Sequence, residues 1–158
     1  MVKRNDPIAE KIKNLLEKQP LAVLATQGDG QPYTSLMAYA FTEDLRFLVF
    51  ATAMSTRKHR NIIGESRVAL LVDDRSNNEE DFQNAAALTI VGEASEVNPD
   101  ERDLYCGLYL RRHPALKTFL ASPSTVFFKI DVHNYLLVSR FEDVVEYKIK
   151  NEEGGLIL

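Results

Sequence analysis

The segment best equipped for chemistry lies between residues 55 and 61, which read STRKHRN. It places three fixed positive charges and two hydroxyls at a point where a helix is expected to begin. A helix start presents unpaired N–H groups and a partial positive charge. Arginine grips a phosphate with paired hydrogen bonds, and lysine adds a compact charge. This basic segment therefore indicates an anion site, with a solvated basic helix face as the alternative.

Other reactive side chains give no comparable pattern. His59, His113 and His133 lack the spacing of metal ligands, so no metal site is expected. Cys106 lies on an apolar helical face and is interpreted as a small packing residue rather than a nucleophile. The acidic stretch 73–81 lacks the ordered alternation of a calcium loop, and solvation explains it better. No catalytic residue is identified.

Short strands are the elements that must position the basic segment. Apolar runs separated by turn residues predict strands over 21–26, 31–41, 46–52, 68–72, 86–97, 125–132, 135–139 and 144–150. Helical patterns are expected over 6–19, 55–65, 99–112 and 115–121. Antiparallel pairing follows, because parallel strands would need a helix after each strand. The fold class is mainly β: an antiparallel barrel closed on itself, with helices packed outside.

Several local signals set the expected boundaries. Asp6 is expected to cap the first helix, and residues 28–30 (GDG) to form a hairpin turn. Ser55 or Thr56 is expected to cap the second helix, with Gly64 in a left-handed conformation at its end. Asn98 is expected to cap a helix that starts at residue 99.

Further local expectations concern the second half of the chain. Gly92 marks a bulge or bend within its strand. Leu104 and Leu108, with Tyr105 and Tyr109 as further candidates, supply the buried face of the third helix. The pair at residues 133–134 (HN) is a turn candidate between two strands, and the stretch 73–83 is interpreted as a mobile surface loop.

Composition limits the partners. The 158 residues contain 19 Lys and Arg against 23 Asp and Glu, a formal charge of −4, which disfavours nucleic-acid binding. The length predicts a single domain over residues 1–158. No apolar run approaches the ~18 residues of a membrane span, and residues 1–7 are too charged for a secretory signal. With a single cysteine, a cytoplasmic protein without membrane contact is expected.

The order of these features resembles the pyridoxamine 5′-phosphate oxidase-like family of FMN-binding split barrels. The resemblance is carried by five stretches, namely 21–26 (LAVLAT), 28–32 (GDGQP), 48–52 (LVFAT), 56–62 (TRKHRNI) and 67–72 (RVALLV). It implies an antiparallel split barrel that holds FMN at a homodimer interface. It also implies an oxidoreductase that acts on an unidentified small molecule.

The resemblance also assigns cofactor-binding residues. Thr52, Thr56, Arg57 and Lys58 match the positions that hold the phosphate and ribityl chain in the family, and Asn61 lies one turn further on. Where the oxidases place an arginine and a lysine on the preceding strand, this chain has Ser35 and Ala40, and Ser35 stays a cofactor-binding candidate.

Three departures argue against vitamin B6 oxidation. One is the loss of the arginine and lysine, and another is that Ala86 and Ala87 replace polar cofactor contacts. The third is the absence of tryptophan, because the oxidases have a C-terminal tryptophan signature. Two alternatives therefore stay open: a module that binds or senses FMN or haem without turnover, and a barrel whose pocket has decayed and whose acidic stretch binds a partner.

Overall fold

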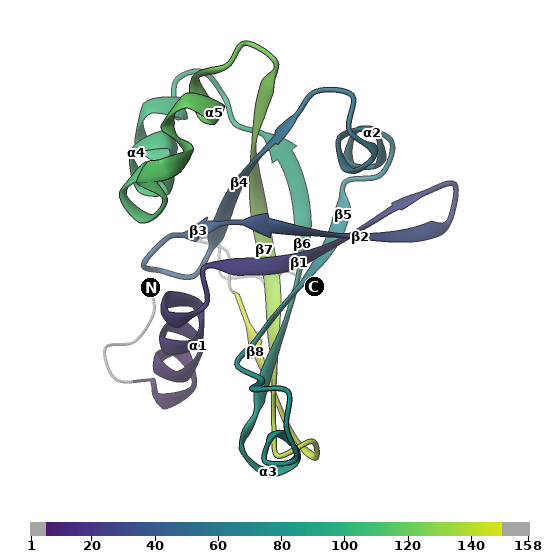
Figure 1. The fold of residues 1–158 in the computed structure, drawn as a ribbon, viewed down its shortest axis with the longest axis vertical. Helices are drawn as coiled ribbons and strands as arrows, with labels where there is room; N and C mark the ends of the chain where they lie inside the picture. Colours follow the sequence, from purple (N-terminus) through teal and green to yellow (C-terminus); the bar gives the residue numbers. More distant parts are fainter. Residues whose placement is uncertain (1–5, 150–158) are drawn as a thin grey trace.

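The computed structural model describes residues 6–149, which form one curled antiparallel sheet of eight strands with helices around it (Figure 1). The strands follow the order β2-β1-β5-β6-β7-β4-β3, and β8 pairs with β7. The mainly β fold class is confirmed.

Helix α1 (Pro7–Lys18) begins as expected. The Asp6 carboxylate accepts hydrogen bonds from the backbone N–H groups of Ile8 (2.9 Å) and Ala9 (3.4 Å). These bonds satisfy two of the donors that a helix start leaves free. The apolar stripe of α1, including Ile12 and Leu16, is buried in the main core.

Strands β1 (Leu21–Gly28) and β2 (Gln31–Ala38) form the expected hairpin. Its two turn residues, Asp29 and Gly30, have φ angles of 51° and 78°. Two consecutive positive φ angles define the turn whose twist matches that of paired strands, and Asp-Gly is a preferred pair for it. The hairpin prediction is confirmed.

The strand expected over 31–41 is divided at Tyr39, and this division closes the barrel. Before Tyr39, β2 pairs with β1; after it, β3 (Ala40–Phe41) pairs with β4 (Phe47–Ala53). β2 and β3 are therefore the two ends of the strand order, yet they are adjacent in the chain. The sheet curls until its two ends are joined by the chain at Tyr39. β2 and β4 are not paired with each other, and this gap between them, the seam, is typical of a split barrel.

Helix α2 (Arg57–Gly64) and strand β5 (Arg67–Asp73) follow β4. Thr56 caps the helix start, as one of the two expected candidates. The left-handed conformation expected at Gly64 is wrong, because the only glycine with a positive φ among residues 6–149 is Gly30. The chain leaves α2 through an extended Glu65 and enters β5 directly.

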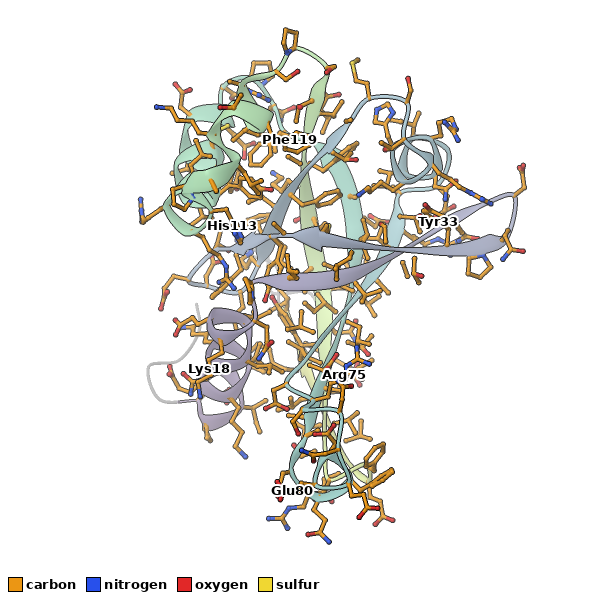
Figure 2. The ribbon with its side chains drawn as sticks, in the orientation of Figure 1. Lys18, Tyr33, Arg75, Glu80, His113 and Phe119 are labelled. Atoms are coloured by element: carbon orange, nitrogen blue, oxygen red, sulfur yellow. The ribbon has the colours of Figure 1, made fainter. Side chains whose placement is uncertain are left out.

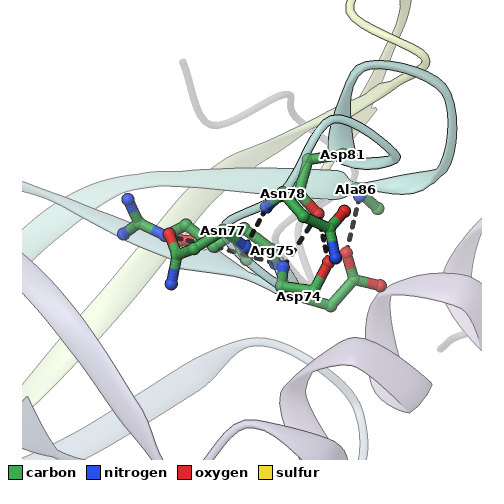
Figure 3. Close-up of polar contacts among 8 residues, drawn as sticks. Asp74, Arg75, Asn77, Asn78, Asp81 and Ala86 are labelled. Carbon is green, nitrogen blue, oxygen red and sulfur yellow. Dashed lines mark hydrogen bonds and ion pairs between the residues drawn. The ribbon is translucent and has the colours of Figure 1, made fainter.

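The acidic stretch after β5 is more ordered than expected (Figure 3). It contains a short helix, α3 (Asp81–Asn84). The Asp81 carboxylate accepts bonds from the backbone N–H groups of Ser76 (2.8 Å) and Asn77 (2.7 Å), and Asp74 accepts one from Ala86 (2.7 Å). The carboxylates of Asp74 and Asp81 therefore help to order this loop.

Strands β6 (Ala86–Glu96) and β7 (Thr125–Ser139) form the longest pairing, and β8 (Asp143–Lys148) extends it. The bulge expected at Gly92 is confirmed by a register shift between Val91 and Gly92. The turn expected at residues 133–134 is wrong. The strand continues through it because His133 is the extra residue opposite that shift, so a polar pair marks a bulge and not a turn. Of the last expected strand, residue 150 lies outside the described residues.

Helix α4 (Arg102–Arg112) starts three residues later than expected. Residues 98–101 form a turn, with Glu101 N–H donating to the Asn98 carbonyl (3.0 Å). The expected burial of Leu104 is also wrong, since 71% of it is exposed. The buried residues of α4 are Tyr105 and Tyr109, four positions apart.

Beyond α4 lie a 3-10 turn (Pro114–Leu116) and α5 (Lys117–Ala121). Together with α4 they cover a second apolar cluster, which includes Val49, Ala51 and Phe127 on the sheet. Cys106 is half-buried beside this cluster, and burial raises the pKa of its thiol. A thiol kept protonated by burial agrees with its interpretation as a packing residue.

Arg112 joins α4 to the end of α1. Its guanidinium donates to the carbonyls of Leu16 and Gln19, the second at 2.7 Å, and lies 4.9 Å from the centre of the Tyr39 ring. The Tyr39 hydroxyl contacts the same two carbonyls, and burial raises the pKa of Tyr39 to about 12, so the hydroxyl remains a donor.

We expect Arg112→Ala to lower the free energy of unfolding by about 2–3 kcal/mol, because it removes a charged donor from carbonyls at a helix end. Urea denaturation followed by circular dichroism measures the change. Arg111→Ala, an exposed neighbour in the last turn of α4, is the matched control and should change it by less than about 0.5 kcal/mol. Equal losses in both variants would contradict this role.

Candidate functional site

The start of α2 lies next to the end of β4 and brings two predicted hydroxyls together. The Thr52 and Thr56 Oγ1 atoms are 3.1 Å apart, and Thr56 Oγ1 accepts a bond from the His59 N–H (3.2 Å). Thr52 is buried. The hydroxyls and the remaining free N–H groups of the first turn form a group of donors at the positive end of the helix.

Three basic side chains of this turn point to different surroundings. The Arg57 guanidinium lies over the Tyr33 ring, 4.8 Å from its centre. It therefore faces the β1–β2 hairpin, on which Tyr33 lies (Figure 2). Arg60 turns back to donate to the Ser55 carbonyl (2.6 Å). Lys58 is half-buried, and that burial lowers the pKa of its ammonium group.

Lys58 has no carboxylate partner within residues 6–149. A partly desolvated cation without an ion pair is unfavourable unless a ligand supplies the negative charge. This is the electrostatic feature expected of an anion site.

Ser35 contributes an unpartnered polar atom. Its Oγ is buried and has no hydrogen-bond partner. Ser35 lies two residues beyond Tyr33 on β2, so both side chains project from the same face of the strand, roughly 7 Å apart along it. Tyr33, whose ring lies under Arg57, and the unpartnered Ser35 hydroxyl therefore share one face of β2.

Asn61 is brought to the site in a supporting position. Its side-chain amide donates to Thr26 Oγ1 (3.0 Å), and both residues are buried. Gly28 permits this approach, because a Cβ there would lie 2.5 Å from Asn61 Oδ1. Asn61, Thr26 and Gly28 thus fix α2 against β1.

Three residues of the site, Thr26, Gly28 and Tyr33, are not predicted from the sequence. The signal available for them was the run ending in Thr26 and the hairpin that follows it. The structure does not bring Ala40 and Ala87 to the start of α2. Ala40 is buried below α4, and Ala87 is half-buried on β6 opposite Val138.

The assembled side chains and N–H groups match one kind of ligand. They offer hydroxyls, helix N–H groups and positive charge, which together suit the oxygens of a phosphate monoester. The set fits the phosphate of a flavin mononucleotide, and the unpartnered Ser35 Oγ and unpaired Lys58 are the observations that such a group would complete.

A comparison with known protein families shows to which family the chain belongs. The model of the family described as pyridoxamine 5′-phosphate oxidase matches residues 8–139, most of the chain. The chain belongs to the pyridoxamine 5′-phosphate oxidase family. The resemblance found in the sequence is confirmed. No curated protein matches this sequence.

Solved structures share the fold of this family member. A protein of unknown function from Agrobacterium tumefaciens is 23% identical, with a TM-score of 0.74 over 87% of this chain and 58% of that one. A haem-binding protein from Mycobacterium smegmatis is 17% identical, with a TM-score of 0.80 over 94% of this chain and 60% of that one. The chain thus spans about three fifths of each of these proteins.

A third structure matches this chain along most of its own length. An FAD-binding protein from Mesorhizobium loti is 19% identical, with a TM-score of 0.65 over 82% of this chain and 90% of that one. At such identities these structures establish the split-barrel fold and leave the ligand open. Among residues 6–149, no helix is long and apolar enough to cross a membrane.

Thr56 offers a direct test of how the start of α2 is ordered in this family member. We expect Thr56→Ala to lower the free energy of unfolding by about 1–2 kcal/mol, because the N-cap acceptor for His59 N–H is lost. Thr56→Ser retains that acceptor and should recover most of the loss. Thermal denaturation measures both variants, and a serine variant as unstable as the alanine variant would contradict the capping role.

Proposed function

We propose that the protein binds FMN, with the phosphate at the start of α2, and acts as an oxidoreductase on a small molecule. The observation that carries this proposal is Lys58, half-buried and without a carboxylate partner beside a helix start. Membership of the pyridoxamine 5′-phosphate oxidase family supports a flavin as the source of the missing anion.

Each residue of the site has a defined task in this proposal. Lys58 and Arg57 balance the phosphate charge. In the Thr52–Thr56 pair one hydroxyl donates to the other, and the second hydroxyl donates its proton to a phosphate oxygen. Ser35 Oγ donates to the ribityl chain, which gives that buried hydroxyl a partner. Tyr33 holds the Arg57 guanidinium in place through its ring. When bound, FMN supplies the electron-transfer chemistry, and the protein binds and orients it.

We further propose that the protein works as a homodimer with the flavin at the interface. The outer face of the sheet supports the homodimer, because a row of facing side chains crosses four strand pairings there. Residues directly opposite each other share a face. This outer row consists of Leu36, Val23, Leu71, Thr89 and Leu136.

None of the outer-row residues is buried, and Leu36 is 65% exposed. Apolar faces of this kind mark protein–protein contacts. A second copy of the chain is the partner that would cover the face by symmetry.

The visible absorption spectrum of the purified protein tests FMN binding. We expect flavin bands in the protein as isolated, or after addition of FMN to protein stripped of cofactor, with a 1:1 ratio of FMN to chain. A protein that binds no FMN by fluorescence titration would overturn the proposal. A haem spectrum would favour a haem-binding module instead.

Turnover is tested separately on the FMN-loaded protein. We expect anaerobic addition of NADH or NADPH to bleach the flavin absorption. Bound flavin that neither nucleotide reduces, while dithionite does, would favour the non-catalytic alternative. Light scattering of the same sample gives the oligomeric state, and a strict monomer would exclude a site shared between two chains.

A further inference from the structure

Two aromatic rings are exposed where α3 meets the turn between β7 and β8 (Figure 1). Phe82 of α3 and Phe141 of the turn are 65% and 62% exposed, and their ring centres are 5.3 Å apart. We call this pair the aromatic clip. Val144 and Val145 follow it on β8 and are exposed as well, although consecutive residues of a strand project from opposite faces. The start of β8 is therefore apolar and exposed on both faces.

The turn that carries Phe141 is strained. Arg140 and Phe141 have φ angles of 53° and 61°, in the left-handed region. Residues with large side chains rarely adopt this region, because their Cβ approaches a backbone carbonyl oxygen. The Phe141 ring nevertheless stays in solvent and does not enter the core. Strained residues are retained where they hold a side chain ready for contact, which indicates a binding role for the clip.

β8 also has a free backbone edge. The Ile149 N–H donates to the His133 carbonyl (2.9 Å), and hydrogen-bonded pairs alternate along an antiparallel ladder. The N–H and C=O groups that point away from β7 therefore belong to Val144, Glu146 and Lys148. Among residues 6–149, β7 is the one strand that pairs with β8. These backbone groups can accept a further strand.

The charge around this edge is negative. Arg75 of the acidic loop already pairs with Asp73 (2.8 Å), and the other cations beside the edge are Arg140 in the turn and Lys148 at the end of β8. The carboxylates outnumber them. Four exposed carboxylates have no hydrogen-bond or ion-pair partner in the described part of the chain, namely those of Glu79, Glu80, Glu142 and Asp143.

This charge selects among the possible occupants of the edge. The unpaired carboxylates repel nucleic acids and anionic lipid headgroups, and a second copy of the chain would bring the same carboxylates against each other. Lysine and arginine side chains are attracted instead. Apolar side chains between them would contact the aromatic clip and the exposed valines. The complementary occupant is therefore a basic segment with apolar residues in it.

We propose that the aromatic clip and the free edge of β8 form a docking site for an extended basic segment of another protein. The segment adds to β8 as a further strand and bonds to the backbone of Val144, Glu146 and Lys148. Its basic side chains lie beside the unpaired carboxylates. The proposal is independent of FMN binding, because Figure 2 shows Glu80 at the opposite end of the molecule from Tyr33.

Fluorescence anisotropy with defined peptides tests the docking site. The probe is an end-capped hexapeptide of alternating lysine and valine, and its control alternates glutamate and valine. We expect the lysine peptide to bind at least tenfold more tightly. Methylation of one alternate set of its backbone amides should abolish binding, whereas methylation of the other set should leave binding nearly unchanged. Equal binding of the lysine and glutamate peptides, or equal loss with both methylated sets, would overturn the inference.

Variants of the chain locate the binding. We expect Phe82→Ser with Phe141→Ser to weaken binding of the lysine peptide at least tenfold. Leu104→Ser, a similarly exposed apolar residue on α4, is the matched control and should leave it unchanged. Glu146→Pro removes an N–H that points away from β7, so it should abolish peptide binding while the circular dichroism spectrum stays the same. Wild-type affinity in the double variant or in the proline variant would overturn the inference.

Other occupants of the edge would give different results with the same samples. Sedimentation of the wild type, but not of the double variant, with phosphatidylcholine vesicles would indicate a lipid surface and overturn the inference. A tenfold rise in the dissociation constant of a dimer on Glu146→Pro would indicate a second copy and also overturn it. FMN titration should give the same affinity in all these variants, which separates this site from the flavin site.

Discussion

Replacing both Arg57 and Lys58 with alanine is expected to weaken FMN binding by about 3–4 kcal/mol, or roughly 100- to 1,000-fold. The physical reason is the loss of two cations that balance the phosphate. Lys58→Ala alone should account for most of the effect, because Lys58 is half-buried whereas Arg57 is exposed and screened by water. Fluorescence titration of stripped protein with FMN gives the constants.

Two controls make the result specific. Arg111→Ala removes an exposed cation from α4 and should leave FMN affinity unchanged. Riboflavin, which lacks the phosphate, should bind the wild-type protein and the double variant with similar affinity. Equal FMN affinity in the double variant and the wild type would place the phosphate elsewhere.

The largest expected effect on stability comes from Gly92→Ala. A Cβ at Gly92 would lie 2.2 Å from the Asp131 carbonyl oxygen and 3.0 Å from Ile130 Cγ2, so β6 and β7 must separate at the bulge. We expect the free energy of unfolding to fall by about 3 kcal/mol, the upper part of the usual range for overpacking. For a chain of this size the melting temperature should fall by roughly 6–12 °C in a calorimetric scan.

Gly107→Ala is the matched control for that experiment. Gly107 lies within α4, where a Cβ would meet no atom within 4 Å. Removing a glycine from a helix interior should raise stability by up to about 1 kcal/mol. The two substitutions add the same methyl group, so opposite signs would isolate the close approach at Gly92. Similar small effects in both would contradict the tight β6–β7 contact.

Local sequence patterns predicted most of the elements whose structure is decided by neighbouring residues. The Asp6 cap, the hairpin at Asp29 and Gly30 and the bulge at Gly92 depend on backbone preferences that a few residues express. The wrong predictions concern residues whose structure is decided by contacts with distant parts of the chain. His133 resembles a turn residue, yet β6 holds the strand extended through it. Leu104 is more apolar than Tyr105, yet the tyrosine faces Phe47 on the sheet, with ring centres 6.4 Å apart.

Only part of the candidate site could be predicted from the sequence, because some of its residues meet through distant contacts. Thr52 and Thr56 are four residues apart, and the structure places their hydroxyls together. Tyr33 and Thr26 come from another part of the chain, and only the closed sheet brings them to α2. The roles of Asn61 and Gly28 depend on one atomic contact between helix and strand, which no local pattern expresses.

The seam at the end of the strand order has a consequence for solubility. β2 pairs with β1 on one side only, so the other edge of its backbone faces the seam. An open strand edge is a template on which another chain can add a strand and begin an aggregate. Pro32 near the start of β2 removes one N–H from the strand, and proline is a common means of protecting such edges. Concentrated protein with Pro32→Val should therefore scatter light sooner on mild heating than the wild type.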